Sequence, residues 1–355
     1  MKLLDRYLMR TVLASTGLVL AVLLALTTLM LFLEQQDDIG AGSYDLGAAF
    51  LFTALSLPQY AYELLPIAAL IGAILGLGAL ARDSELTVLR ASGVSVARIA
   101  GAAALAGAVL AGVLWLLGEH LAPPARDYAR YQKVFSMNAE LDIAGRRSAW
   151  VRQGPWFINV RQQSAEGLFG GVFLFRLDRQ GRLERVGRAD TAAQDPDGGW
   201  ILTRYAETRL GADRTEVRSG ERERTDADFN ADFLGLAVTE PRAQPLRSLR
   251  AYLAHQRANG LDTRATEIQY WSRWARLAAA VVVCVFAVPF AFGPLRSAGA
   301  GARSVFGIVL GILFVLLSQT LENSGKVYQL DPQLVAWGPT ALLALVALLA
   351  IRRTR

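Results

Sequence analysis

Three basic residues are spaced so that they could bind an anionic ligand. Arg126, Arg130 and Lys133 follow one another at intervals of four and three residues, which places them along one face of a helix. Arginine binds phosphate oxygens through two parallel hydrogen bonds, so the pattern predicts a site for a phosphate-bearing ligand. The alternative is that the three side chains extend toward lipid headgroups from the end of a membrane helix.

A second candidate site is the stretch Ser-Glu-Leu-Thr-Val-Leu-Arg-Ala-Ser-Gly that begins at Ser84. Ser84 can cap a helix, Glu85 suits the positive end of the helix dipole, and Gly93 can end the helix in a left-handed conformation. Leu86 and Leu89 fall on one helix face. The pattern predicts a short helix that either rests on lipid headgroups or docks a soluble partner, and it favours neither.

Motifs for catalysis or nucleotide binding are missing from the sequence. The only Gly-Lys pair, at Gly325, is followed by Val327 where a P-loop needs Ser or Thr. GxSxG and HExxH do not occur. One cysteine, Cys284, and two distant histidines, His120 and His255, argue against a disulfide framework or a Cys/His metal cluster. We therefore expect no catalytic residue, no metal site and no cofactor bound by this chain.

Three carboxylates, Glu63, Glu119 and Glu322, lie near the ends of apolar runs. Buried carboxylates relay protons in some membrane transporters. Because each residue is so close to the end of its run, we favour the interpretation that all three lie at headgroup level.

The composition divides the chain into apolar ends and a charged middle. Hydrophobic residues make up 53% of the 355 residues and charged residues only 19%, against about 25% charged in soluble domains. Of the 37 Lys and Arg, 25 lie between Ala122 and Arg276, as do 20 of the 31 Asp and Glu. A fully soluble enzyme is therefore excluded.

Six uncharged runs are each near the roughly 20 residues that cross a bilayer as a helix. They are residues 11–33, 64–81, 99–118, 277–295, 304–321 and 332–351. A further run, 46–62, contains Pro58 and is interpreted as an approach segment and outer extension of the second span, which gives six crossings. The alternative is seven crossings.

The distribution of charge favours six crossings. They place Arg82, Arg90 and Arg98 on the same side as both basic termini, while residues 34–45 on the other side are acidic. The first run also exceeds the roughly 7–15 apolar residues of a cleavable signal peptide. We expect both termini in the cytoplasm and the central domain outside it, so the basic excess reflects topology rather than a nucleic-acid partner.

The charged middle has the pattern of an all-β domain. Short strands are predicted at residues 156–160, 172–177, 200–203 and, more weakly, 215–218, with turn clusters at 178–181 and 195–199. Such strands suggest a sandwich, a jelly roll or an open barrel. The period becomes helical over residues 248–276, which predicts a helical lead into the fourth span. The expected domains are residues 1–138, 139–247 and 248–355.

Six short motifs occur in a fixed order along the chain. They are Gly42-Ser43-Tyr44-Asp45, Leu77-Gly78-Ala79-Leu80-Ala81, Ser84-Glu85-Leu86, Ala91-Ser92-Gly93, Gly118-Glu119-His120-Leu121-Ala122-Pro123 and Phe292-Gly293-Pro294-Leu295-Arg296-Ser297. Each motif is weak alone, but their order is specific. With three spans, a β domain and three further spans, the chain resembles the LptF/LptG family of lipopolysaccharide export permeases. The first and last motifs favour the LptG branch.

The resemblance implies a non-catalytic permease subunit with six transmembrane helices and an inserted periplasmic β jelly-roll-like domain. Such a subunit would form a heterodimer with an LptF-like permease and bind an LptB-like dimer of cytoplasmic ATPases, which holds ATP and Mg²⁺. An LptC-like protein would be a further partner. The complex would extract lipopolysaccharide from the bacterial inner membrane and pass it through the β domain toward the outer membrane.

The resemblance also implies roles for both candidate sites. Ser84, Glu85, Leu86, Leu89 and Arg90 match the family's ATPase-coupling helix. The second set comprises Arg130 and Lys133, with Arg126 beside them, and corresponds to basic positions that face the lipid A phosphates.

One departure from the family concerns the outer end of the first span. Family members often have basic residues there, whereas this chain has Leu31, Asp37 and Asp38. We therefore expect Arg130 and Lys133 to contribute more of the phosphate recognition here.

Two other functions are alternatives. An ion-coupled secondary transporter would show internal repeats and buried ionisable residues, and we find neither in the sequence. A membrane scaffold or sensor would use its β domain to bind a partner. Co-purification with an ATPase would separate both from an exporter.

Overall fold

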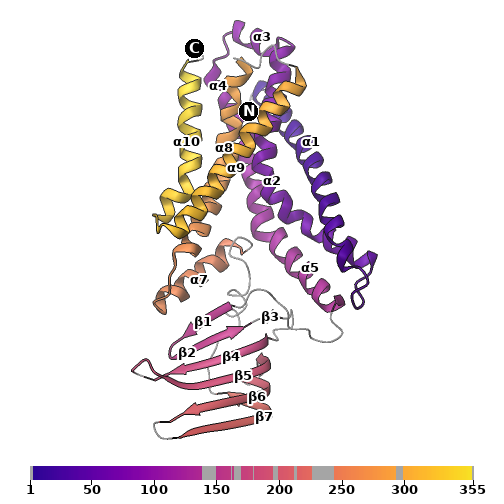
Figure 1. The fold of residues 1–355 in the computed structure, drawn as a ribbon. Helices are drawn as coiled ribbons and strands as arrows, with labels where there is room; N and C mark the ends of the chain where they lie inside the picture. The colour runs from indigo at the N-terminus through magenta and orange to yellow at the C-terminus, as the bar shows by residue number, and fades with distance from the viewer. Residues whose placement is uncertain are drawn as a thin grey trace. The chain divides into compact units, whose positions relative to one another are not determined.

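The computed structural model (Figure 1) describes the chain except for residues 1–2, 138–148, 161, 164–168, 179, 195–198, 212–213, 226–243, 293–298 and 354–355. The described residues form two compact units. One contains residues 1–37, 53–126 and 267–355, and the other contains residues 38–52 and 127–266.

Six helical stretches of the described chain are long and apolar enough to cross a membrane, which confirms the predicted number. The helices are α1 (Leu3–Glu34), η1 (Gln36–Asp38), α2 (Leu46–Arg82), α3 (Glu85–Ala91), α4 (Val96–Leu116), η2 (Leu117–Leu121), α5 (Ala122–Met137), α7 (Leu246–Ala258), α8 (Arg264–Phe292), α9 (Ala300–Val327) and α10 (Pro332–Arg353). The third stretch runs continuously from α4 through η2 into α5.

One prediction about the helices is confirmed and one is wrong. Helix α2 continues through Pro58 and Pro66, so the approach segment and the second span are one helix. Membrane helices tolerate proline because neighbouring groups satisfy the freed carbonyls. The helical lead over residues 248–276 is instead two helices. Gly260, with φ of +63°, ends α7, and the Asp262 carboxylate accepts the Arg264 N–H at 3.0 Å where α8 begins.

Small residues allow the helices to pack closely. A Cβ atom on Gly72 of α2 would lie 2.4 Å from the Thr16 Cα of α1. One on Gly107 of α4 would lie 2.6 Å from the Val281 Cα of α8. Glycine is therefore required at both contacts, as is common between membrane helices, where close van der Waals packing replaces the hydrophobic effect. The core of this unit combines side chains from α1, α2, α3, α4 and α8.

The described strands of the second unit form one antiparallel sheet, in the order β1-β2-β4-β5-β6-β7 with β3 paired to β4. The strands are β1 (Ala149–Gln153), β2 (Trp156–Val160), β3 (Gln162–Gln163), β4 (Phe169–Leu177), β5 (Leu183–Gln194), β6 (Trp200–Leu210) and β7 (Thr215–Thr225). The predicted membrane protein with an inserted all-β domain is thus confirmed, and the described strands follow chain order through most of the sheet.

All four predicted strands are present, within β2, β4, β6 and β7. No strand is predicted at β5, whose twelve residues include Gly187 and few β-branched side chains. Its pairing with β4 and β6 on either side holds it in the sheet. Glycine at 187 leaves room for the Tyr205 ring, because a Cβ atom there would lie 3.0 Å from that ring. Trp200, Leu202 and Tyr205 belong to the apolar cluster on this sheet.

Candidate functional site

The predicted short helix exists as α3, and the backbone conformation at each end shows what starts and stops it. Gly93 has φ of +88°, so its left-handed conformation is confirmed. The capping role of Ser84 is wrong, because its side chain makes no capping hydrogen bond. Ser84 has φ of 63°, since α2 ends only two residues earlier, whereas a capping residue needs an extended backbone.

One side of α3 is fixed to the helical unit. Leu86 is buried at 1% exposure in the core, and Leu89 packs partly against it. The Tyr7 hydroxyl of α1 donates a hydrogen bond to the Glu85 carboxylate at 2.7 Å. The Arg90 guanidinium lies 5.5 Å from the centre of the Phe292 ring at the end of α8. A force on α3 would therefore reach α1 and α8 through direct contacts.

The opposite side of α3 faces outward. Val88 is 65% exposed, and Thr87 and Arg90 are exposed as well. An apolar side chain beside a cation is suited to docking another surface. The five predicted residues are therefore divided: Leu86 and Leu89 hold the helix, while Arg90 remains at the surface.

The three basic residues all lie on α5, as predicted, but their surroundings differ. Arg130 is exposed and Arg126 is half-buried. The Lys133 ammonium lies 2.6 Å from the Asp38 carboxylate, and their side chains are 23% and 32% exposed. Lys133 is thus already engaged by an anion from the same chain, and the sequence-based reasoning missed this contact.

Two aromatic rings also contact Lys133. Its ammonium lies 5.0 Å from the centre of the Phe52 ring and 5.7 Å from that of Tyr44. Both distances are within the range of a cation–π interaction. Burial raises the pKa of the Tyr44 hydroxyl, and the nearby Asp38 charge raises it further. A carboxylate and two rings therefore surround this ammonium.

Hydrogen bonds attach the segment that carries Asp38 to α5. The backbone N–H and the hydroxyl of Ser43 both donate to the Ser136 carbonyl, at 2.6 and 3.0 Å. Gly40 and Gly42 have positive φ, and the Gly40 N–H donates to the Tyr44 carbonyl at 2.9 Å. Backbone contacts therefore hold this turn on α5, and they place Asp38 against Lys133 in addition to the ion pair itself.

A third charged group lies inside the helical unit. Arg273 of α8 donates to the Gly118 carbonyl at 3.1 Å and pairs with Glu119 at 3.3 Å, with side chains 8% and 12% exposed. Both partners belong to the π-helical turn η2, whose wide geometry frees a carbonyl for such a contact. Glu119 is therefore mostly buried and paired, and its place at headgroup level stays a prediction. The Arg273 guanidinium also lies 5.5 Å from the centre of the Tyr62 ring.

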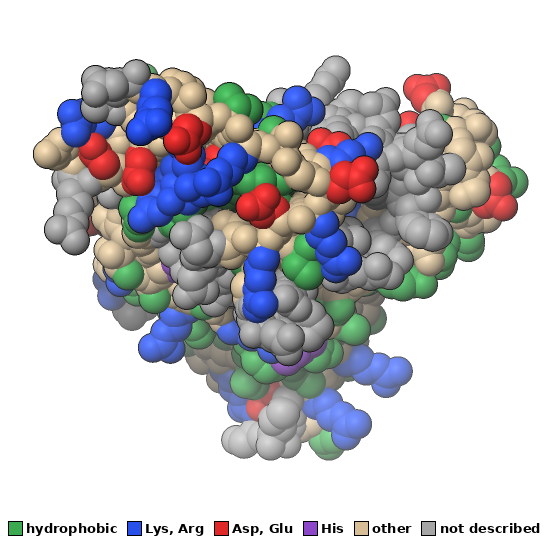
Figure 2. Space-filling view, turned by 90° about the horizontal axis from the view of Figure 1, so that it is seen from below, with side chains coloured by type: hydrophobic (Ala, Val, Ile, Leu, Met, Phe, Trp, Pro, Cys, Tyr) green, Lys and Arg blue, Asp and Glu red, His purple; other side chains and the backbone are tan. Residues whose placement is uncertain are grey.

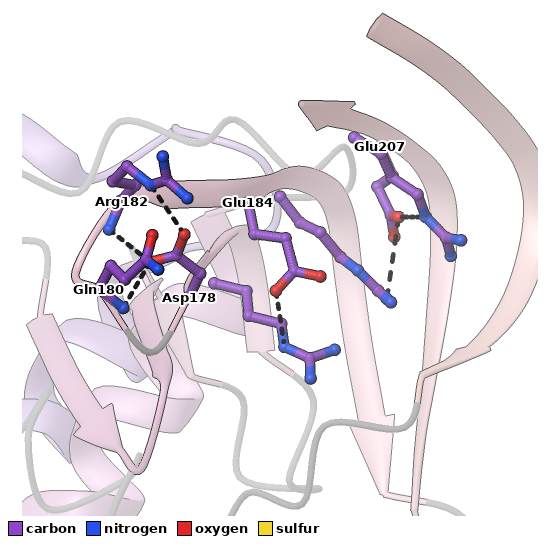
Figure 3. Close-up of polar contacts among 8 residues, drawn as sticks. Asp178, Gln180, Arg182, Glu184 and Glu207 are labelled. Carbon is purple, nitrogen blue, oxygen red and sulfur yellow. Dashed lines mark hydrogen bonds and ion pairs between the residues drawn. The ribbon is translucent and has the colours of Figure 1, made fainter. Parts of the chain in front are cut away.

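The β domain holds its own ion pairs, shown in Figure 3. Asp178 accepts hydrogen bonds from the backbone N–H groups of Arg182 and Gln180 at 2.9 and 2.8 Å, which lower its pKa. These contacts close the predicted turn between β4 and β5. Glu184 pairs with Arg176 at 3.5 Å across the same two strands.

Glu207 is the most buried carboxylate of this group (Figure 3), at 6% exposure. It accepts hydrogen bonds from Tyr205 and Arg209, and Arg185 lies 4.0 Å away. Burial alone would raise the pKa of Glu207, but these donors outweigh it and lower the pKa. Burial raises the pKa of Tyr205, and its hydrogen bond to the Glu207 carboxylate raises it further. This network orders the sheet rather than presenting a reactive group.

The surface of the sheet carries charges of both signs. On β7, Glu216, Arg218, Glu221 and Arg222 are all exposed. Figure 2 shows Lys or Arg side chains beside Asp or Glu side chains on the face viewed from below. Within the described part of the chain, no group of three or more potential metal ligands comes together.

Comparison with known proteins decides the family. Residues 6–353 match the family "Lipopolysaccharide export system permease LptF/LptG". The chain belongs to the LptF/LptG family. It is 30% identical to the lipopolysaccharide export system permease protein LptG of Escherichia coli strain K12 over 352 residues, covering 99% of this chain and 98% of that protein. The LptG of Haemophilus influenzae strain Rd is 27% identical over 353 residues, covering 99% of both chains.

Membership in the LptF/LptG family accounts for the order of the elements. Six candidate spans and a permease family identify a multi-pass membrane protein. A permease subunit also fits the lack of recognisable catalytic motifs in the sequence. The buried Arg273–Glu119 pair meets one requirement of a secondary transporter, but the family match over nearly the whole chain favours the export permease.

Proposed function

We propose that this chain is the membrane subunit of an ATP-driven exporter that takes lipopolysaccharide from the inner membrane. The observation that carries the proposal is the family match over residues 6–353, on a chain with six candidate spans and an inserted β domain. The relatives from Escherichia coli and Haemophilus influenzae are named as LptG permeases of a lipopolysaccharide export system.

An energy source on another subunit is part of the proposal. Moving several acyl chains through water exposes apolar area at roughly 25 cal/mol per Å², so extraction needs work. This sequence has no P-loop. We assign ATP and Mg²⁺ to an LptB-like dimer on the cytoplasmic side, with an LptF-like permease and an LptC-like protein as the other partners.

In this proposal α3 is where the ATPase acts. Its outer side offers Val88 and Arg90, while Leu86 and the Tyr7–Glu85 hydrogen bond join it to the helical unit. A short helix that is packed on one side and exposed on the other can transmit displacement without unfolding. In this proposal Glu85 keeps α3 oriented against α1 while the ATPase displaces α3.

The basic residues of α5 are proposed to receive the lipid phosphates. Arg130 is exposed, and a guanidinium can bind phosphate oxygens in pairs. The β domain then takes the lipid onward, while its buried apolar cluster, which includes Ile158, Leu174 and Leu202, holds the sheet together. Both termini would be cytoplasmic and residues 139–247 periplasmic.

Mass spectrometry of the purified chain tests the proposal. The tagged full chain is extracted in detergent from its native host, and its co-purifying proteins and lipids are identified. We expect a cytoplasmic ATPase, a second six-span permease and lipopolysaccharide. Recovery of the chain without any ATPase, under conditions that keep other membrane complexes intact, would contradict an ATP-driven role.

Cysteine labelling tests the topology separately. Cys284, the only cysteine, is first replaced by alanine. Single cysteines at Arg90 and at Arg218 then report on the α3 loop and on β7. An impermeant reagent applied to intact spheroplasts should label the second position and not the first. Labelling at Arg90 would overturn the six-span orientation.

A further inference from the structure

Asp38 and Lys133 form an ion pair with unusual local support. Their charged atoms are 2.6 Å apart, although 95 residues separate them in sequence. The Ser43–Ser136 hydrogen bonds hold the two backbone segments together independently of the charges. The rings of Tyr44 and Phe52 hold the ammonium from other directions. Backbone hydrogen bonds and two aromatic rings therefore fix the position of Lys133, in addition to the Asp38 carboxylate.

The pair is nevertheless within reach of an outside anion. The Lys133 and Asp38 side chains are 23% and 32% exposed, so both remain in contact with the surroundings. Pairs with this much exposure contribute about 1 kcal/mol at most. An anion with a higher charge can therefore replace the carboxylate, provided that it gains more from the ammonium than Asp38 does.

The type of anion that can do so follows from charge. A phosphodiester lipid headgroup carries one negative charge shared by two oxygens, about the same as the carboxylate it must displace. A phosphate monoester carries about −1.5 to −2 charges and three acceptor oxygens at neutral pH. Asp38 also repels any anion while it remains in place, which is a way of building specificity through an unfavourable contact.

We infer that Asp38 is an internal counter-ion that makes Lys133 selective for phosphate monoesters over phosphodiester headgroups. The inference rests on the proposed phosphate-binding role of α5. It adds that the Asp38 carboxylate competes with the phosphate for Lys133. Ordinary phospholipids then fail to displace the carboxylate, while a monoester does. The rings of Tyr44 and Phe52 keep the ammonium in position during the exchange.

The experiment compares two lipids with matched acyl chains, of which one has a phosphate monoester and the other a phosphodiester headgroup. The purified full chain is placed in nanodiscs of neutral lipid that contain either phosphatidate or phosphatidylglycerol with identical acyl chains. Binding is measured by native mass spectrometry or by photo-crosslinking at α5. For the wild type we expect a preference for phosphatidate. In Asp38→Asn that preference should fall by about threefold to fivefold, the range for a partly exposed ion pair, mainly because phosphatidylglycerol binds better.

Matched variants separate the ion pair from bulk charge and from folding. Asp37→Asn makes the same change in net charge at the neighbouring exposed residue and should leave the preference as in the wild type. Asp38→Glu retains the charge and should largely restore it. In a Lys133→Gln background, Asp38→Asn should have no further effect on the preference. Unfolding temperatures of each variant confirm that the chains compared are folded.

Several results would overturn the inference. Equal effects of Asp37→Asn and Asp38→Asn would show a general charge effect, and an undiminished effect in the Lys133→Gln background would place the action of Asp38 elsewhere. No change in Asp38→Asn would remove the counter-ion role. A wild type that binds lipid A no better than its dephosphorylated form, yet shows the expected lipid preference and its loss in Asp38→Asn, would reject the proposed substrate and support the counter-ion.

Discussion

Glu85 on α3 and Lys133 on α5 are each held by a contact from another part of the chain, but the two contacts differ in kind. Glu85 accepts a hydrogen bond from the neutral hydroxyl of Tyr7, at 2.7 Å. Lys133 faces the charged carboxylate of Asp38, at 2.6 Å. A neutral donor orients a carboxylate and leaves its charge available to a partner, whereas an opposite charge competes with any ligand. The contact with Tyr7 therefore orients Glu85, whereas the contact with Asp38 means that an anion binds Lys133 only if it displaces the carboxylate.

The Arg273–Glu119 pair provides a reference for both contacts. It is so buried that no ligand can replace either partner. Replacing Arg273 by leucine leaves Glu119 and the Gly118 carbonyl without this donor. Losing one partner of a buried pair costs about 3–5 kcal/mol, so this variant should show the largest loss of stability. Thermal unfolding of the full chain in detergent measures it. Arg273→Leu with Glu119→Gln should recover part of the loss, and a fully stable single variant would contradict the burial.

The next largest effect concerns transmission through α3. Glu85→Ala removes both the charge and the Tyr7 contact, and we expect lipopolysaccharide release to fall about tenfold or more, given about 1.5–3 kcal/mol for a hydrogen bond to a charged group. Tyr7→Phe leaves the carboxylate and should reduce release only about twofold to threefold. Reconstitution of the permease with its ATPase in proteoliposomes measures both. If Tyr7→Phe were as severe as Glu85→Ala, the tyrosine would do more than orient.

Single substitutions on α5 should divide the phosphate recognition unequally. Arg130 is exposed, while Lys133 first has to exchange Asp38. We therefore expect Arg130→Gln to weaken lipopolysaccharide crosslinking about threefold to tenfold, and Lys133→Gln only about twofold, in line with partly exposed charges. Assembly with the ATPase serves as the control, since it should be unchanged in both. Equal losses would show that Asp38 does not reduce the contribution of Lys133.

The smallest effect is expected in the β domain, where Glu207 is held by donors that no ligand needs to displace. Its folded pKa lies below its ordinary value of 4.5. The stabilisation is therefore complete above pH 4.5 and is lost as the pH falls through the lower folded pKa. Hydrogen exchange of β6 in the full chain, measured from pH 7 down to acid, should show this loss. Glu207→Gln should remove the acid dependence, and an unchanged profile in that variant would assign it to other carboxylates.

The sequence alone determined the number of spans and the presence of an inserted β domain. Long uncharged runs identify membrane helices because charge in hydrocarbon is costly, and alternation identified β2 at its observed bounds, Trp156–Val160. The same local rules located α3 and put the three basic residues on one helix. They failed at β5, where pairing with β4 and β6 on both sides overrides local preference.

Only the tertiary structure decided which charges are paired. Asp38 and Lys133 are 95 residues apart, and Glu119 and Arg273 are 154 residues apart. Neither separation has a period that a sequence pattern can reveal, because the contacts depend on how whole helices and turns pack. The acidic residues at the end of the first span looked like missing phosphate ligands in the sequence. In the folded chain one of them, Asp38, pairs with Lys133, since the hydrogen bonds from Ser43 to the Ser136 carbonyl bring the turn onto α5.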